Sequence, residues 1–236
     1  MNIDSFLQKL RPLYSNSDLS VCCDSQLALI KSHLNGCTGN NLDLDTIKEV
    51  VQLSTKLNLP IGQERNLAYL SHYTSTSGTV EFVLLPTLEG FVHAFDQVPG
   101  VNIHQLLSVR NGMEVSYKDD AMGTPMVKPV RGIERKVSGA MCVLNVSGDK
   151  LTTTINQREL MTMAKISGRE IDAEFALLHV LKRALKTFVS PYGSQLSALQ
   201  QIANRWDQAL FIPFRQTARQ IMQRSNAERL LKSQPF

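Results

Sequence analysis

Basic side chains gather in a loop near the middle of the sequence. Residues 119–135 are polar and are interrupted by two glycines and two prolines, which predicts an irregular loop between strands. Four cations fall within nine consecutive positions at its end: Lys128, Arg131, Arg135 and Lys136. Lysine and arginine spaced along a groove neutralise the phosphates of a nucleic acid strand without reading its bases. This loop is therefore a candidate binding surface.

A second set of cations lies on a predicted helix at residues 172–188. Four apolar residues at helical spacing form one stripe along it: Leu178, Leu181, Leu185 and Phe188. Four titratable residues that follow i, i+3, i+4, i+7 form another stripe: His179, Lys182, Arg183 and Lys186. We expect the first stripe to pack against the core and the second to face solvent as a cationic surface.

One more cation is placed by a predicted turn. Asn-Gly is the preferred dipeptide of two-residue hairpin turns, because both positions tolerate positive φ. Asn111-Gly112 therefore predicts a hairpin of residues 103–110 and 113–118. Arg110 stands directly before this turn and would be carried at the tip of the hairpin.

Flat side chains could stack on bases beside these cations. Tyr69 and Tyr73 lie in a predicted strand at residues 67–73, which would form a hairpin with residues 79–85. Aromatic residues make up only 6% of the chain, so most of them are needed in the core. The two tyrosines are the candidates for stacking.

Motifs of several enzyme classes are absent from the sequence. It has no Walker A pattern, no Gly-x-Ser-x-Gly elbow and no zinc-ligand spacing among its histidines and cysteines. Glu114, Asp119 and Asp120 are the closest approach to the gathered carboxylates of a metal-dependent nuclease. The sequence favours a protein that is not an enzyme and holds no metal, with the nuclease as an alternative.

Composition and charge set the broad class. The chain has 236 residues, 43% of them apolar, and contains neither a run of eighteen apolar residues nor the pattern of a signal peptide. Its four cysteines lack paired spacing, which favours a reducing compartment. Net charge is −4 over residues 1–109, +1 over 110–181 and +7 over 182–236. We expect a soluble, cytoplasmic protein whose basic parts meet an anionic polymer.

The order of predicted elements indicates an α+β fold. It has a helical N-terminal third, central antiparallel β-hairpins forming a sheet packed on helices, and a helical C-terminal appendage. In the N-terminal third, Thr46 and Glu49 match a capping box that would begin a helix ending before Pro60. We divide the chain into a core of residues 1–190 and a C-terminal region of residues 191–236 for assembly or partner contacts.

The order and spacing of short segments resemble the RecT family of phage single-strand DNA annealing proteins. The resemblance spans roughly residues 20–188 and depends on no single motif. The segments are, in chain order, LNLP (57–60), NLAYL (66–70), VEFVLL (80–85), TLEGF (87–91), SVRNGMEV (108–115), GAMCVLNVSG (139–148), NQREL (156–160) and ALLHVLKRALK (176–186).

The resemblance implies an ATP-independent protein that coats single-stranded DNA and anneals complementary strands in a positively charged groove. It implies rings or filaments of identical subunits, an annealed duplex intermediate, a partner exonuclease, a host single-strand binding protein and no membrane, in the cytoplasm of a bacterial host cell. It implies no nucleotide cofactor, with Mg²⁺ at most a modulator of annealing. The expected DNA contacts are Arg110, Lys128, Arg131, Arg135, Lys136, Lys182, Arg183, Lys186, Tyr69 and Tyr73.

Three other functions remain open at this point. The chain could bind single-stranded DNA as a replication or recombination accessory protein without annealing it. It could be the metal-dependent nuclease built on the three carboxylates. It could also be a structural phage protein whose C-terminal helices only assemble subunits. Annealing without ATP, magnesium-dependent cleavage and failure to bind DNA at low salt would separate these alternatives.

Overall fold

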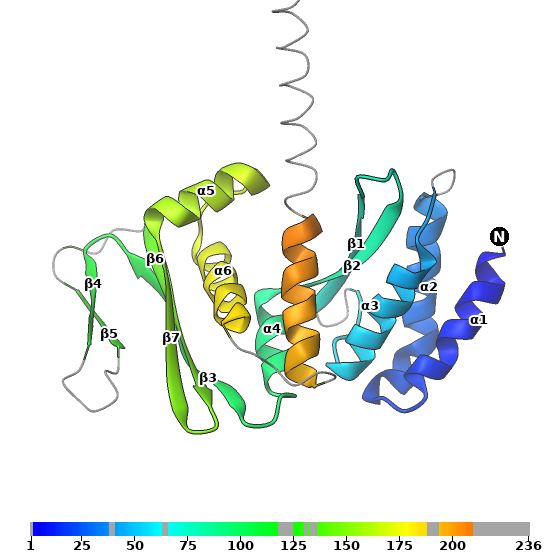
Figure 1. Cartoon of the computed structure of the whole chain (residues 1–236), viewed down its shortest axis with the longest axis horizontal. Coiled ribbons are helices and arrows are strands. Elements are labelled where there is room, and N and C mark those ends of the chain that lie inside the picture. Colours follow the sequence, from blue (N-terminus) through cyan, green and yellow to red (C-terminus); the bar gives the residue numbers. More distant parts are fainter. Residues whose placement is uncertain are drawn as a thin grey trace, which may run out of the picture.

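The computed structural model describes residues 2–37, 41–62, 66–117, 125–129, 132, 136–187 and 194–209 (Figure 1). Over these ranges the chain has the α+β architecture that the sequence predicts. In the view of Figure 1 a helical part lies at one end of the molecule and a sheet at the other. No helix within the described ranges is both long enough and apolar enough to cross a membrane.

The helical part is built from the N-terminal third of the chain. Its elements are α1 (Ile3–Tyr14), the 3₁₀ helix η1 (Asp18–Cys22), α2 (Cys23–Gly36) and α3 (Leu44–Lys56). Each α-helix turns an apolar stripe inward, so that Leu10, Ile30 and Ile47 are almost completely buried. These helices form the scaffold at this end of the molecule.

The start of α3 differs from the predicted capping box at Thr46. Asp43 is the N-cap, and its carboxylate accepts from the backbone amides of Asp45 and Thr46. The Thr46 hydroxyl instead donates to the Asp43 carbonyl and accepts from the backbone amide of Phe82 at 2.9 Å. Thr46 therefore links α3 to a strand, a role that local sequence could not indicate.

A hairpin and a short helix connect the two parts of the molecule. They are β1 (Ala68–Thr74), β2 (Val80–Pro86) and α4 (Leu88–Phe95), and the antiparallel pairing of β1 with β2 confirms the predicted hairpin. A Cβ at Gly90 would lie 1.8 Å from the carbonyl oxygen of Leu67, so only glycine allows α4 to pack this closely.

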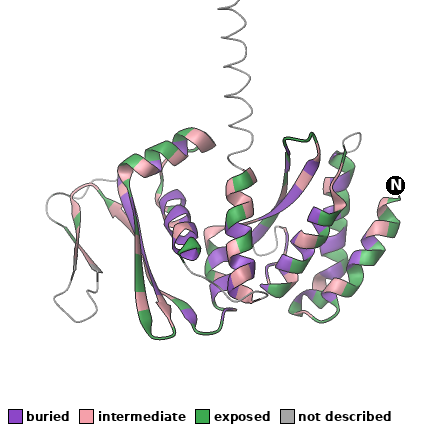
Figure 2. Ribbon diagram, in the orientation of Figure 1, coloured by how far each residue is buried: buried purple, intermediate pink, exposed green. Residues whose placement is uncertain are grey.

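A three-stranded antiparallel sheet forms the other end. Its strands, in spatial order, are β3 (Val101–Arg110), β6 (Val137–Val146) and β7 (Asp149–Asn156), and the helices that follow are α5 (Gln157–Ser167) and α6 (Ala173–Lys186). Alternate residues of β6, namely Ala140, Cys142 and Leu144, join the core cluster together with α6. Buried residues predominate along α6 (Figure 2).

The predicted hairpin across Asn111-Gly112 is wrong in its pairing. A turn is present, but β3 pairs with β6, while β4 (Met113–Tyr117) pairs with β5 (Pro125–Pro129). Gly112 has positive φ and Asn111 does not, so the turn lacks the geometry that keeps two flanking strands together. The strand β5 also lies in a stretch that the sequence predicts to be an irregular loop.

Residues 195–209 form a helix that packs into the core and is not an appendage. Leu199, Ile202 and Ala203 are fully buried. The Trp206 ring stacks on Phe91 of α4 with centroids 5.8 Å apart, and Arg205 pairs with Glu49 of α3 at 2.8 Å. Among the described residues the boundary predicted at 190/191 therefore does not separate a core from a C-terminal region.

Candidate nucleic-acid interface

Lys182 lies inside the molecule, contrary to the expectation of an exposed cationic stripe on α6. Its side chain is 2% exposed, and its Nζ donates to Asp207 Oδ1 at 2.8 Å. The same Nζ lies 4.5 Å from the centre of the Trp206 ring, a cation–π arrangement. Burial lowers the pKa of Lys182, and the Asp207 carboxylate opposes that shift. Lys182 therefore holds the 195–209 helix against α6.

The other two cations of this stripe also have partners within the chain. Arg183 donates to Glu159 Oε1 at 2.7 Å and to the Thr154 carbonyl at 3.0 Å, and Lys186 forms an ion pair with Asp207. Burial would raise the pKa of Asp207, but the two lysines outweigh it and hold the pKa below its ordinary value. The predicted stripe is thus a set of ion pairs that joins α6 to its neighbours.

His179, the fourth residue of the stripe, is buried and uncharged at neutral pH. Its ring centroid lies 4.3 Å from that of Phe175. Burial, assisted by the positive charge of Lys182, lowers the pKa of His179 to about 3. Its contribution is to core packing, and protonation would oppose the fold.

The two tyrosines differ in accessibility. Tyr73 is buried and donates to Glu81 Oε2 at 2.6 Å; burial and this hydrogen bond raise its pKa to about 12. It is therefore closed to bases. Tyr69 is 44% exposed and lines a hollow of about 470 Å³ that also contains Glu89 and Glu174. Two carboxylates beside Tyr69 would repel a phosphate backbone, so this hollow is poorly suited to a nucleic acid.

Arg110 and Lys136 are brought together by the register of the sheet. Arg110, the last residue of β3, lies opposite Val137, the first residue of β6. The backbone amide of Asn111 donates to the Lys136 carbonyl at 3.0 Å, which fixes the two segments at this point. Both cations are exposed. The structure thus places two predicted contacts, twenty-six positions apart in sequence, at one end of one sheet.

Arg158 lies at the same end of the sheet and is not among the predicted contacts. Gly139 of β6 faces Val109 of β3 on one side and Asn156 of β7 on the other. Asn156 caps α5 through a capping box with Glu159, so Arg158 occupies the first turn of that helix and is exposed. The sequence contains a signal for the position of Arg158, because a tight turn at residues 147–148 places residue 156 opposite residue 139 on the neighbouring strand.

We call Arg110, Lys136 and Arg158 the sheet-end surface. None of the three forms an ion pair with another described residue. This contrasts with the α6 cations, each of which has a carboxylate partner. Unpaired cations retain their full charge toward a ligand and release counterions when a phosphate replaces them.

The remaining predicted cations belong to the segment between β4 and β6. Lys128 is exposed on β5 and lies opposite Glu114 of β4 in the register of that hairpin. Arg131 and Arg135 lie outside the described residues, as do Asp119 and Asp120 of the nuclease alternative. In the described part of the chain, no three His, Cys, Asp or Glu side chains are grouped as metal ligands.

The sheet face that points away from the core cluster continues from the sheet-end surface. Alternation places Met141 and Val143 of β6 on this face, and their register partners on β7 are Thr154 and Thr152. Both threonines are exposed. In Figure 1, α5 and α6 lie on one side of the sheet and the β4–β5 hairpin on the other. Met141 and Val143 are fully buried, so the part of this face that is open beside the sheet-end surface consists of the two threonines on β7.

No protein-family model matches the chain, and no curated protein is significantly similar to it. Function must therefore be inferred from the sequence and from the geometry described above.

Proposed function

We propose that this protein binds single-stranded DNA at the sheet-end surface and anneals complementary strands without ATP. The observation that carries the proposal is the gathering of Arg110, Lys136 and Arg158 at one end of the sheet. Antiparallel pairing brings these exposed cations together from three separate segments of the chain. An anionic strand would meet there a local positive charge that no described carboxylate neutralises.

The chemistry of the site suits annealing. Contacts to phosphates hold a strand without occupying the hydrogen-bonding edges of its bases, which stay free to pair with a second strand. The adjoining strand β7 offers the exposed hydroxyls of Thr152 and Thr154, which do not discriminate between bases at fixed positions. Binding of this kind tolerates any sequence, as an annealing protein requires.

The resemblance to the RecT family supports the same proposal from a separate direction. It supplies the annealing activity, the self-assembly into rings or filaments, and the partnership with an exonuclease and a host single-strand binding protein. The sheet-end geometry supplies a different set of contacts from the helix stripe. Arg110 and Lys136 are retained and Arg158 is added, whereas the three cations of α6 are assigned to ion pairs within the chain.

The decisive experiment is annealing of two complementary, dye-labelled oligonucleotides by the full-length protein without nucleotide. We expect annealing to be faster than in a protein-free control, and the acceleration to fall as salt rises, because phosphate contacts exchange with salt ions. Binding without acceleration would support the accessory protein, and cleavage that requires magnesium would support the nuclease. No interaction at low salt would overturn DNA binding altogether.

A further inference from the structure

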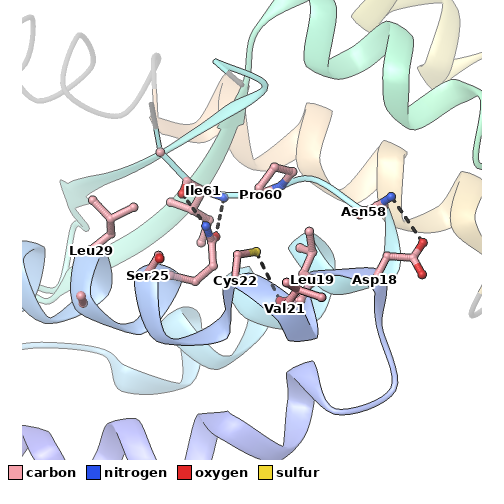
Figure 3. A pocket seen from close by; sticks show the side chains of 12 residues that line it. Asp18, Leu19, Val21, Cys22, Ser25, Leu29, Asn58, Pro60 and Ile61 are labelled. Atoms are coloured by element: carbon pink, nitrogen blue, oxygen red, sulfur yellow. Dashed lines mark hydrogen bonds between the residues drawn. The ribbon is translucent and has the colours of Figure 1, made fainter. Parts of the chain in front are cut away.

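A groove on the helical part of the molecule has no role in the proposed function. It has a volume of about 690 Å³ and lies between the start of α2 and the segment 58–62 (Figure 3). Its size falls in the range of ligand-binding pockets, about 300–1,000 Å³. The walls are mainly apolar, with one carboxylate at the end, and are formed by Leu19, Val21, Leu29, Pro60, Ile61 and Asp18.

Buried hydrogen bonds hold the two walls in place. The Gln26 side chain, which is buried in α2, donates to the Ile61 carbonyl at 2.8 Å and accepts from the Ile61 amide at 2.6 Å. Beyond Ile61 the chain turns at Gly62, which has φ of +116°, and a Cβ there would lie 2.5 Å from Leu29 Cδ1. The groove is therefore preformed, so little free energy is needed to order it when a ligand binds.

The groove exposes apolar side chains next to the carboxylate of Asp18. Val21 is 96% exposed and Leu29 is 39% exposed, and both line the groove. Asp18 accepts a long hydrogen bond from Asn58 at 3.5 Å and forms no ion pair with a described residue. A complementary ligand would present bulky apolar side chains followed by a positive charge.

The C-terminal segment of the chain has this chemistry. Residues 210–215 read Leu-Phe-Ile-Pro-Phe-Arg, and the whole segment 210–236 carries five basic residues and one acidic residue. The part of the chain that contains the groove, residues 1–109, has a net charge of −4. Apolar burial and charge complementarity therefore both favour this segment as the occupant.

We propose that the groove of one molecule binds residues 210–215 of a second copy, with Phe211 or Phe214 between the apolar walls and Arg215 facing Asp18. In Figure 1 the 195–209 helix ends at the top of the molecule, whereas α2 begins at the bottom, which favours a second copy over the same chain. The contact is a route to self-association that does not require DNA, so it can be tested separately from the proposed function.

Cys22 provides a natural probe inside the groove. It lines the groove and is partly exposed, whereas the other cysteines, Cys23, Cys37 and Cys142, are buried. In the full-length Phe214→Cys variant, mild oxidation should give disulfide-linked dimers on a non-reducing gel, well above the wild-type level. Adding Cys22→Ser should abolish them. The control Thr76→Cys, in the exposed β1–β2 turn, should stay at the wild-type level.

The cross-linking experiment can also contradict the proposal. If Phe214→Cys gives no more dimer than Thr76→Cys, or if Cys22 is linked within one chain, binding by a second copy is overturned. Sedimentation velocity without DNA provides an independent measure: Val21→Asp and Phe214→Asp should each weaken self-association at least tenfold. Met161→Asp, at a residue 58% exposed on α5, should leave it unchanged. Equal behaviour of all three variants would also overturn the proposal.

Discussion

Individual phosphate contacts at Arg110, Lys136 and Arg158 determine the salt dependence that we expect for DNA binding. Each contact to a single strand contributes about 0.7 to the slope of log affinity against log salt. Replacing all three with alanine should therefore weaken binding to a labelled oligothymidylate and reduce that slope by about 2. Fluorescence anisotropy titrations over a salt series would measure both quantities.

Two controls make this prediction specific. The triple variant Lys9→Ala, Lys48→Ala, Lys56→Ala removes the same charge from exposed positions on α1 and α3, and should leave the slope nearly unchanged. Lys182→Met should also leave it unchanged, because the ammonium of Lys182 is buried against Asp207. A slope lowered by Lys182→Met but not by the sheet-end variant would move the interface to α6.

His179 should make the fold sensitive to acid. Its pKa is about 3 in the folded protein against about 6.5 in an unfolded chain, so between these values the unfolded state binds more protons. The free energy of unfolding should therefore fall as pH falls, by up to about 1.4 kcal/mol per pH unit from this group. Urea unfolding at pH 6, 5 and 4 would measure the slope. His179→Asn should make it shallower, and an identical slope in both proteins would contradict the argument.

At the scale of elements, the 195–209 helix should unfold together with the core. Trp206 is the only tryptophan of the chain, and it lies between Phe91 and Lys182, so its fluorescence reports whether this helix is docked. Urea titrations followed by Trp206 fluorescence and by far-ultraviolet circular dichroism should give one coincident transition. An earlier fluorescence transition would show that the helix is a separate unit.

Replacing the Trp206 ring measures how much its contacts contribute to the free energy of unfolding. Trp206→Ala removes the stacking on Phe91 and the cation–π contact with Lys182, and should lower the free energy of unfolding by about 3 kcal/mol. Chain truncation after residue 193 removes the whole helix, including the buried side chains of Leu199 and Ile202, and exposes the apolar surface on which they pack, which is more damaging still. Truncation after residue 209 keeps these contacts, so its circular dichroism melt should stay close to that of the full chain.

Elements with strong local sequence patterns were predicted well from the sequence, whereas the pairing between elements was predicted less well. The β1–β2 hairpin and the helix at 172–188 follow from alternation and helical spacing. The pairing of β3 with β6 could not be predicted from Asn111-Gly112, because the choice of a partner strand for β3 depends on how β6 packs against α6. A turn signal contains no information about that packing.

The residues of the candidate site were also predicted only in part, because their exposure depends on other elements. Helical spacing correctly places Lys182, Arg183 and Lys186 near one another on α6, but whether that face is open depends on Asp207 and Glu159, which come from other elements. Arg158 could have been predicted from the sequence, since strand register alone places it near Arg110. Arg158 stands apart from the other cations in the sequence, and only strand pairing brings it close to Arg110 and Lys136.

On the scale of the whole molecule, the two proposed surfaces lie in different parts. The sheet-end surface belongs to the sheet, and the groove lies between the start of α2 and the segment 58–62, in the helical part (Figure 1). Binding of a DNA strand therefore need not compete with binding of a second copy. Molecules joined through the groove would still present their sheet ends to DNA, which is the arrangement that a coat on a single strand needs.

Hydrogen exchange tests this separation across the full-length protein in one measurement. A bound oligothymidylate should slow exchange at the end of β3, the start of β6 and the first turn of α5, where the three cations lie, because bound phosphates suppress local opening there. The backbone of α1 and α3 should exchange at the same rate with and without DNA. Protection confined to α1 and α3 would place the DNA on the acidic end of the molecule, which the charge distribution opposes, and would refute the sheet-end assignment.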